Sequence, residues 1–438
     1  MARHNHNNGG YMTDDSQGAF RRKEAWVPTP RPEWVKILNE QASHLDMASV
    51  VPLDFQSLID QAVRNSGLTD FGDDAWLGHF KVLMTSIEEE ANLHFAGRIL
   101  TRYEFVRYLE IRLSLVDWLK REPAILDQTI DRPVIITGFG RSGTTILYEV
   151  LSQDPQFRVP LKWEALFPVP PPETASYHSD PRITRTEGIN SFQENLIPEM
   201  KGMHKSAATL PVESVELVYF TFLSEVFTFG FQVPSYVRYL ETQDLGYCFE
   251  WQKKLLKLLQ WRHRGNHWLL KGPSHLPYMR ELLGAFPDAR IIFTHRDPIV
   301  SADSVVSLQA SLYWWRTDTP WGDGSLDNWV IGSAQTRASL WDDIIAMLDD
   351  GTLDKRQVSN FQYREFMADP MAAVRGIYRD FDLELTSEVE ARMVKFLADK
   401  PQGKFGKHEY QHAPDEVIRH ERAVYSKYQA YFSVPNEL

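Results

Sequence analysis

The segment that most constrains the fold is a short β-branched run that leads directly into a glycine-rich turn and then a helical pattern. The run PVIIT begins at Pro133, the turn reads GFGRSGTT (138–145), and the pattern ILYEVLSQ ends near Asp154 and Pro155. A strand, a tight loop and a helix in this order begin an α/β unit.

Three later runs have the character of buried parallel strands, because each is short, rich in apolar residues and followed by a helical stretch. They are HWLLK at 267–271, ARIIFTH at 289–295 and QVSNFQY at 357–363. The sequence therefore predicts an α/β fold in which a P-loop-like parallel sheet is flanked by helices.

The rest of the chain is expected to be helical or flexible. Residues 1–30 are polar and predict a flexible N-terminal arm, in which His4 and His6 are solvated rather than metal ligands. Residues 31–130 repeat apolar residues at three- and four-residue steps, which predicts a helical N-terminal region packed on the core. Residues 131–438 are expected to form one α/β domain with a helical insertion at about 180–265.

Charge and cysteine content exclude several classes of protein. The 438 residues include 47 Lys plus Arg, 59 Asp plus Glu and a single cysteine, Cys248. One cysteine rules out an intrachain disulfide scaffold and suits a reducing compartment. The net charge of −12 argues against a nucleic-acid partner but allows a small anionic ligand in a local basic pocket. The polar N-terminus lacks the apolar stretch of a secretory signal, so we expect a cytoplasmic location.

Only Leu217–Val237 invites a membrane interpretation, since Glu225 is its single charged residue. The stretch also contains Gln232 and Pro234 and is crowded with aromatic residues. A buried helix or a pocket wall is therefore favoured over a transmembrane segment. Peripheral membrane contact and the oligomeric state stay open at this point.

The glycine-rich turn fits two phosphate-binding patterns in part. Gly138, Gly140 and Gly143 satisfy the G-x-G-x-x-G pattern of dinucleotide-binding loops, and Glu164 follows about 20 residues later, near the place of a ribose-binding acid. The same loop fits the glycines of the P-loop pattern, although Thr144 stands where that pattern has its lysine.

What the turn offers physically is a phosphate cradle. Glycines let backbone N–H groups point inward, and the following helix presents its positive end. Hydroxyl groups come from Ser142, Thr144 and Thr145, and Arg141 adds a permanent cation. The alternative is a structural turn with surface hydroxyls.

A second anion-binding position is predicted at THRDPIVSADS. Arg296 ends a predicted strand, Asp297 and Pro298 are suited to begin a helix, and Ser304 follows within that helix. The string His295-Arg296-Asp297 also suggests a protein kinase, but the sequence DFG at 70–72 lies upstream of it rather than downstream.

Taken together, these features resemble the sulfotransferases that use 3′-phosphoadenosine 5′-phosphosulfate (PAPS), in particular the bacterial sulfotransferase-like proteins. The resemblance rests on the RSGTT loop, on Lys271 at the end of an intermediate strand, and on the Arg296 and Ser304 pair. It extends from Gly67 to Tyr410 through the segments GLTDFGDDAW, RPVIITGFGRSGTT, LLKGPSHL, FPDARIIFTHRDP and GKHEY.

The resemblance implies a role for each matching position. The 5′-phosphosulfate would lie in the loop formed by Gly140, Arg141, Ser142, Gly143, Thr144 and Thr145. Arg296 and Ser304 would bind the 3′-phosphate, and Tyr363 would contact adenine. Lys404 and Lys407 would lie in a basic loop over the 3′-phosphate. PAPS would be the co-substrate, released as PAP, with no metal ion.

The chain departs from the cytosolic animal enzymes at three positions. Arg141 stands in place of a lysine, so its role would be purely electrostatic. Ile146 stands in place of a tryptophan, which removes one adenine-stacking surface. His275 comes four residues after Lys271 rather than two.

Sulfuryl transfer resembles in-line phosphoryl transfer, in which a protein positions the reactants and stabilises charge. Lys271 and Arg141 would stabilise the charge that develops as the bond breaks. The general base is expected to be His275, with Glu213 second and His204 third.

The acceptor is expected to be a small hydrophobic or aromatic molecule with a hydroxyl group. Its pocket would lie in the insertion, with walls from Trp163, Tyr219, Phe220 and Phe222, although such a stripe also suits a core. Three alternative functions remain: a P-loop nucleotide kinase or NTPase, a dinucleotide oxidoreductase, and a catalytically inactive nucleotide-binding relative.

Overall fold

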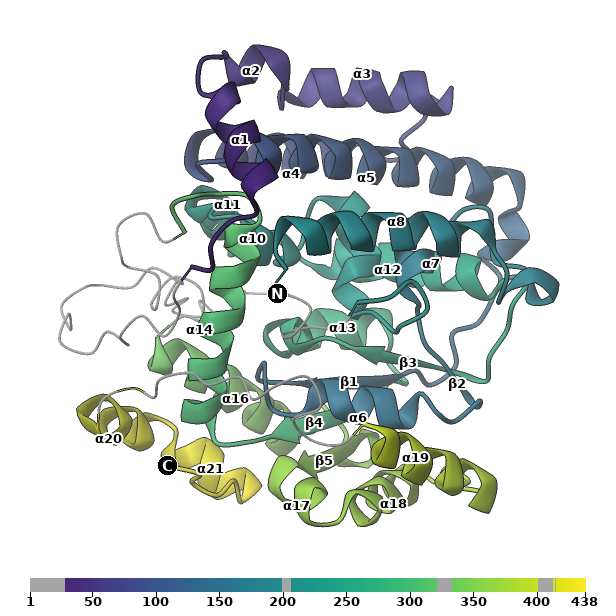
Figure 1. The fold of residues 1–438 in the computed structure, drawn as a ribbon. Helices are drawn as coiled ribbons and strands as arrows, with labels where there is room; N and C mark the ends of the chain where they lie inside the picture. The colour runs from purple at the N-terminus through teal and green to yellow at the C-terminus, as the bar shows by residue number, and fades with distance from the viewer. Residues whose placement is uncertain (1–27, 199–205, 321–332, 401–412, 414) are drawn as a thin grey trace.

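A parallel β-sheet lies at the centre of the computed structural model, which describes residues 28–198, 206–320, 333–400, 413 and 415–438 (Figure 1). In this part of the chain five strands are ordered β2-β3-β1-β4-β5, and all neighbouring pairs are parallel. The strands are β1 (Val134–Gly138), β2 (Phe157–Arg158), β3 (His267–Lys271), β4 (Arg290–His295) and β5 (Val358–Gln362). The predicted α/β fold with a parallel sheet flanked by helices is confirmed.

The four runs predicted as strands are β1, β3, β4 and β5, each correct to within one residue at either end. Strand β2 is missed by the sequence analysis. It consists of two residues that pair with His267 and Trp268, and two residues are too few to show a strand pattern.

The central strands are buried on both faces, which is why they read as continuous apolar runs. Alternate residues of β1 point to opposite sides, so Ile135 packs into the larger hydrophobic cluster while Val134 and Ile136 pack into the smaller one. In β3, Leu270 packs into the larger cluster and Leu269 into the smaller one. The sheet therefore separates two cores.

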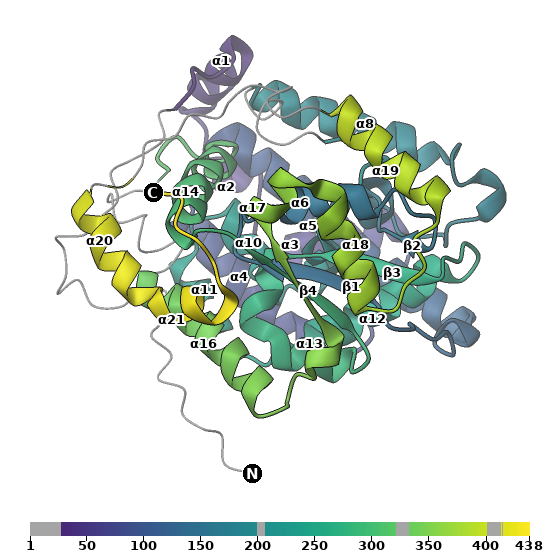
Figure 2. The same ribbon diagram turned by 90° about the horizontal axis from the view of Figure 1, so that it is seen from below.

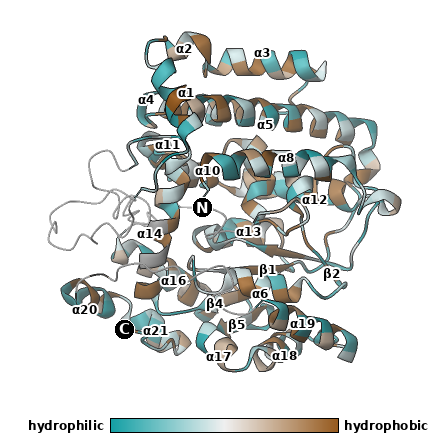
Figure 3. Cartoon of the chain, in the orientation of Figure 1, coloured by the Kyte–Doolittle hydropathy of each residue, from teal (hydrophilic) through white to brown (hydrophobic). Residues whose placement is uncertain are grey.

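The larger core joins the sheet to the N-terminal helices and to the helices of the insertion. In Figure 1 the N-terminal helices are stacked on the side of the molecule away from α17–α19. They are α1 (Glu33–Ala42), α2 (Met47–Val50), α3 (Phe55–Ser66), α4 (Ala75–Glu90) and α5 (Phe95–Arg121), followed by the 3₁₀ helix η2 (Pro123–Ile125). Helices at the periphery, such as α3, carry hydrophilic and hydrophobic residues along their length, as expected for packing through one face (Figure 3).

Together with β2 and β3, helices of different lengths and 3₁₀ helices lie between β1 and β4. They are α6 (Thr144–Leu151), α7 (Lys162–Leu166), η3 (Thr174–Ser176), α8 (Pro181–Leu196), η4 (Ser214–Thr221), α10 (Val226–Gly230), α11 (Pro234–Leu240), α12 (Gly246–Gln260), η5 (Pro273–Tyr278) and α13 (Met279–Ala285). The stretch 217–237 is divided among η4, α10 and α11. Among the described residues, no helix has the length and apolar character needed to cross a membrane.

The C-terminal part of the chain completes the sheet and covers its other face. Viewed from below, α6, α17, α18 and α19 lie over the strands (Figure 2), and α6, α18 and α19 contribute to the smaller core. The elements after β4 are α14 (Pro298–Trp314), α16 (Ala334–Asp349), η6 (Lys355–Gln357), α17 (Tyr363–Ala368), α18 (Pro370–Asp380), α19 (Ser387–Asp399), α20 (Asp415–Val424) and α21 (Ser426–Phe432).

His295, the last residue of β4, ties the C-terminal helices to the sheet. Its Nδ1 lies 3.1 Å from the hydroxyl of Tyr428, and its Nε2 lies 2.9 Å from the Oδ1 of Asn360. The ring also stacks against Phe432 with 4.5 Å between centroids. The side chain is fully buried, and this burial lowers its pKa to about 4.

We expect the free energy of unfolding to fall as the pH drops below about 6.5. An unfolded histidine titrates near that value, whereas the folded pKa of His295 is about 4. The unfolded state then binds a proton that the folded state does not, which costs about 2 kcal/mol per histidine at about pH 5. We expect the free energy of unfolding, measured by urea denaturation at pH 7 and pH 5, to fall less between these two pH values in His295→Asn than in the unaltered protein. Equal losses in the two proteins would contradict this assignment.

Candidate active site

The segments that follow β1, β3, β4 and β5 meet at one edge of the sheet, because the carboxyl ends of parallel strands share that edge. The loop 139–143 joins β1 to α6. Lys271 is the last residue of β3, Arg296 follows β4 and Tyr363 follows β5. The fold thus brings together four positions that are far apart in the sequence.

Glycine is required in this loop because of close approach to neighbouring strands. A Cβ at Gly138 would lie 2.4 Å from the Oγ1 of Thr294, and a Cβ at Gly143 would lie 2.6 Å from the Cδ2 of Tyr363. Both glycines have positive φ, 146° and 95°. Arg141 also has positive φ, 68°, and its side chain is exposed. The loop is therefore a tight turn that presents a cation at the edge of the sheet.

The hydroxyl groups of the loop differ in availability. Ser142 is fully buried, and its hydroxyl lies 2.6 Å from both the carbonyl oxygen of Phe139 and the Oγ1 of Thr294. Its side chain therefore fastens the loop to β4, a use that the sequence did not indicate. Thr144 is buried at the start of α6, while Thr145 is exposed.

Lys271 and Glu213 form an ion pair beside the loop. The Nζ of Lys271 lies 2.5 Å from the Oε1 of Glu213, with 3% of the lysine side chain and 34% of the glutamate side chain exposed. Ser214 holds this arrangement in place, because its hydroxyl donates to the carbonyl oxygen of Lys271 at 3.1 Å. Gln252 of α12 in turn donates to the carbonyl oxygen of Ser214 at 2.7 Å. The pair therefore combines a buried cation with a partly accessible carboxylate.

His275 lies behind this pair rather than facing solvent. Its ring is 2% exposed, and its Nε2 is hydrogen-bonded to the hydroxyl of Ser214. Burial lowers the pKa of His275 to about 4, against an opposing effect of Glu213. This environment suits a residue that positions Ser214. His204, the third candidate base, falls outside the described residues.

Arg296 is held by contacts from three sides. Its guanidinium lies over the ring of Tyr363, 4.5 Å from the centroid, and its Nη1 donates to the carbonyl oxygen of Arg141 at 3.3 Å. Its Nε and Nη2 each donate to the carboxylate of Glu437, both at 2.9 Å. The structure thus joins the predicted second anion position to the glycine loop and shows that its arginine can hold a carboxylate.

Three of the predicted nucleotide-binding side chains are not described. Ser304 belongs to α14, but only its backbone lies within the described structure. Lys404 and Lys407 fall in the segment 401–412, outside the described residues. Asp297 does cap α14 as expected, since its carboxylate accepts from the backbone N–H of Ile299.

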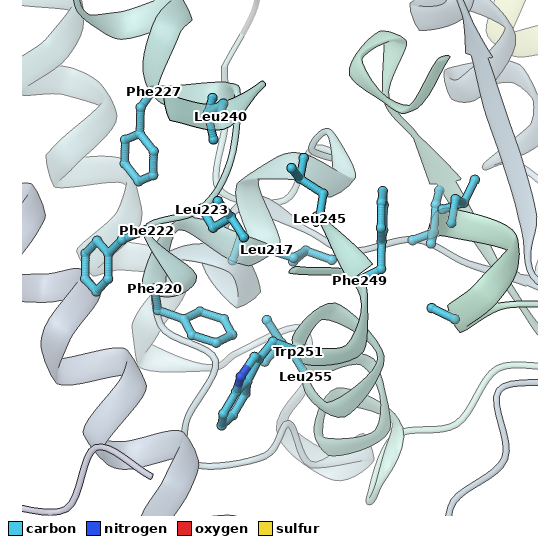
Figure 4. Close-up of a cluster of buried hydrophobic side chains, with 14 of the residues drawn as sticks. Leu217, Phe220, Phe222, Leu223, Phe227, Leu240, Leu245, Phe249, Trp251 and Leu255 are labelled. Atoms are coloured by element: carbon cyan, nitrogen blue, oxygen red, sulfur yellow. The ribbon is translucent and has the colours of Figure 1, made fainter. Parts of the chain in front are cut away.

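The aromatic residues expected to wall an acceptor pocket are mostly core residues. Trp163 and Phe222 are 0% exposed and Phe220 is 2% exposed. Figure 4 shows Phe220 and Phe222 within a packed hydrophobic cluster. Tyr219 is only partly buried, and its ring stacks on Tyr108 at 4.6 Å. For Trp163, Phe220 and Phe222 the structure therefore supports the interpretation as core residues, which pack against other buried side chains.

Two carboxyl groups that interact with Glu213, those of Glu216 and Glu225, were not among the sequence-based candidates. Burial raises the pKa of Glu216, an effect that Lys162 opposes. Burial also raises the pKa of Glu225 to about 8. Acidic residues in an otherwise apolar stretch were the available signal. Among the described residues, no group of three or more His, Cys, Asp or Glu is arranged to hold a metal ion.

A comparison with known protein families matches the part of the chain that contains the sheet and the candidate site. A sequence model described as "Sulfotransferase family" matches residues 133–387, more than half of the chain. The match begins one residue before β1 and ends at the first residue of α19. It therefore covers the whole described sheet.

Individual relatives are similar over most of the chain. Omega-hydroxy-beta-dihydromenaquinone-9 sulfotransferase Stf3 from Mycobacterium bovis and from Mycobacterium tuberculosis is 28% identical over 282 residues, which are 61% of this chain and 67% of the relative. The crystal structure of sulfotransferase STF9 from Mycobacterium avium has 25% identity and a TM-score of 0.72, covering 87% of this chain and 97% of its own. Sulfotransferase STF1 from Mycobacterium tuberculosis H37Rv has 25% identity and a TM-score of 0.69, covering 85% and 98%.

We expect Gly143→Ala to lower the free energy of unfolding more than Gly67→Ala does. Both glycines have positive φ, 95° and 70°, so each alanine carries a backbone cost of about 1–2 kcal/mol. Only at Gly143 does the added Cβ meet another side chain, since nothing lies within 4 Å of it at Gly67. Chemical denaturation of both variants measures the difference. If the two variants lost the same free energy of unfolding, the contact between residue 143 and Tyr363 would carry no energetic cost for the added Cβ.

Proposed function

The chain belongs to the sulfotransferase family, and on that premise we propose that it transfers a sulfuryl group from PAPS to a hydroxyl group of a small hydrophobic or aromatic acceptor. The observation that carries the proposal is the common sheet edge at which the glycine loop, Lys271 and Arg296 lie. In the sheet order β3-β1-β4 the glycine loop lies between Lys271 and Arg296, so the two proposed anion-binding positions are neighbours and the lysine lies on the other side of the loop from Arg296.

The donor substrate would be held by the loop at one end and by Arg296 at the other. Residues 140–145 would bind the 5′-phosphosulfate through backbone N–H groups at the start of α6 and through the Arg141 cation. Arg296 would bind the 3′-phosphate, since its guanidinium fork already holds a carboxylate. Tyr363, which stacks on Arg296, would lie beside the adenine. Ser304, Lys404 and Lys407 remain proposed contacts to the 3′-phosphate.

In the transfer step the acceptor oxygen forms a bond to sulfur while the bond from sulfur to the phosphate oxygen breaks, and PAP leaves. The Lys271 ammonium group meets the negative charge that grows on the departing oxygen. The proton of the acceptor hydroxyl passes to a carboxylate and then to solvent. The protein's part is to position the reactants and to balance charge.

Glu213 is the general base that the geometry favours. Its carboxylate contacts Lys271 directly and is partly exposed, so an acceptor hydroxyl can reach it. His275, the first choice from the sequence, is buried against Ser214 with its pKa lowered to about 4. A ring without access to the acceptor hydroxyl cannot take its proton, so burial is the reason for preferring Glu213.

The acceptor class rests on the surroundings of this pair. Glu213 leads into η4, an apolar segment whose Tyr219 is partly exposed. The name of the relative Stf3 gives a hydroxylated dihydromenaquinone as its acceptor. Both observations support a hydrophobic molecule with a hydroxyl group. A cytoplasmic location remains a prediction from the sequence.

PAP should raise the melting temperature of the protein without magnesium, whereas ATP and NAD should have little effect. A ligand at one hundred times its Kd stabilises the folded state by about 2.7 kcal/mol. A thermal melt with each nucleotide, followed by calorimetric titration with PAP, measures this. A shift that needs magnesium and ATP would favour a nucleotide kinase or NTPase, and a shift with NAD alone would favour an oxidoreductase. No shift with PAP would overturn the proposal.

Glu213→Gln should reduce kcat for transfer from labelled PAPS by about 10²-fold or more, the usual effect of losing a general base. The Kd for PAP should change less than kcat does, because the proposed role of Glu213 is toward the acceptor hydroxyl. Glu89→Gln is the matched control, since Glu89 is exposed on α4. If Glu213→Gln retains its kcat while a folded His275→Asn variant loses it, the base is His275. If neither variant of a PAP-binding protein shows transfer and the unaltered protein shows none, the chain is an inactive relative.

A further inference from the structure

The segment 434–438 lies across the proposed 3′-phosphate position. The carboxylate of Glu437 accepts from the Nε of Arg296 at 2.9 Å and from its Nη2 at 2.9 Å. This two-point contact has the geometry with which arginine binds a phosphate group. Glu437 thus occupies the donor groups that the nucleotide would use.

Other contacts hold this segment in place. The backbone N–H of Glu437 donates to the Oδ2 of Asp297 at 2.7 Å. Asp297 is buried and also accepts from both terminal nitrogens of Arg422, at 2.9 and 3.0 Å. Arg422 donates further to the carbonyl oxygen of Leu438 at 3.2 Å. Nearby, the Nε2 of Gln429 donates to the Oδ1 of Asn436 at 2.9 Å.

We propose that Glu437 is an internal ligand of the 3′-phosphate position, so that it competes with the nucleotide for Arg296 and sets the affinity for nucleotides that carry a 3′-phosphate. This inference rests on the proposed function. It assigns a specificity role to a residue 141 positions away from Arg296 in the sequence.

The contacts around Arg296 allow this exchange without moving the arginine. The stacking on Tyr363 and the hydrogen bond to the carbonyl oxygen of Arg141 do not involve Glu437. The fork therefore stays aligned when its carboxylate partner leaves. The Arg296 and Glu437 side chains are 19% and 29% exposed, so an incoming anion can reach them.

The anchoring of the segment gives the internal ligand its strength. A tethered group has an effective concentration in the millimolar range or above. Val434 is buried and its backbone N–H is bonded to the carbonyl oxygen of Gln429 at 2.9 Å, so the tether begins at a fixed point. Among the described contacts of Glu437, those to Arg296 and to Asp297 are the ones that its displacement affects. A phosphate dianion can replace the first of these, whereas a nucleotide without a 3′-phosphate has no group that does so.

The test compares Glu437→Gln with the unaltered protein by calorimetric titration with PAP and with AMP. The Kd for PAP should fall by about three- to fivefold in the variant, the upper part of the range for losing one partly exposed competing ion pair. The Kd for AMP should stay within about twofold, since AMP lacks the 3′-phosphate. Glu416→Gln is the matched control. Glu416 is exposed on α20, and its substitution changes the net charge by the same amount. It should leave both affinities unchanged.

The outcomes separate this inference from the function on which it rests. If neither protein binds PAP, the proposed function fails and the inference fails with it. If the unaltered protein binds PAP but Glu437→Gln binds it equally or more weakly, only the inference is overturned. An equal gain for PAP and AMP, or the same gain in Glu416→Gln, would indicate a general effect of charge and would also overturn it.

Discussion

Parallel pairing of β1 with β3 on one side and β4 on the other is the constraint on which the rest of the molecule depends. It sets the carboxyl ends of the central strands side by side, so the glycine loop, Lys271 and Arg296 need no long segments to meet. Close contacts with neighbouring residues hold the glycine loop in place. Gly138 lies against β4, and Gly143 lies against the residue that follows β5.

The sequence predicted the parts of the fold that are governed by local pattern. Strands buried on both faces are continuous apolar runs, so β1 and β3 to β5 could be recognised, whereas the two-residue β2 could not. Apolar spacing does not separate core from pocket, so the sequence left both interpretations open for Trp163 and Phe222, which the structure places in the core. The contacts of Ser142 and His275 depend on partners brought in by folding. Glu437 could not be connected to Arg296, because no local pattern relates residues 141 positions apart.

Charge at the sheet edge is arranged in pairs within a chain of net charge −12. Lys271 contacts Glu213, and Arg296 contacts Glu437. Each carboxylate stabilises a cation that would otherwise be partly desolvated without compensation. The two ion pairs differ in the proposed role of the carboxylate when substrates bind. In the proposed function Glu213 stays and accepts a proton, whereas in the further inference Glu437 gives way to the nucleotide.

The hydrogen bond from Ser214 to the carbonyl oxygen of Lys271, at the end of β3, allows the acceptor-binding part of the chain to vary while the nucleotide-binding part stays unchanged. Through the hydroxyl of Ser214 the start of η4 is fixed to the backbone of Lys271, and this bond uses no residue further along the insertion. Exchange of the chain beyond η4 between relatives would then leave the lysine and its carboxylate in register. The same anchor makes residues 212–214 a natural junction for chimaeras, in which acceptor preference is transplanted onto an unaltered nucleotide core.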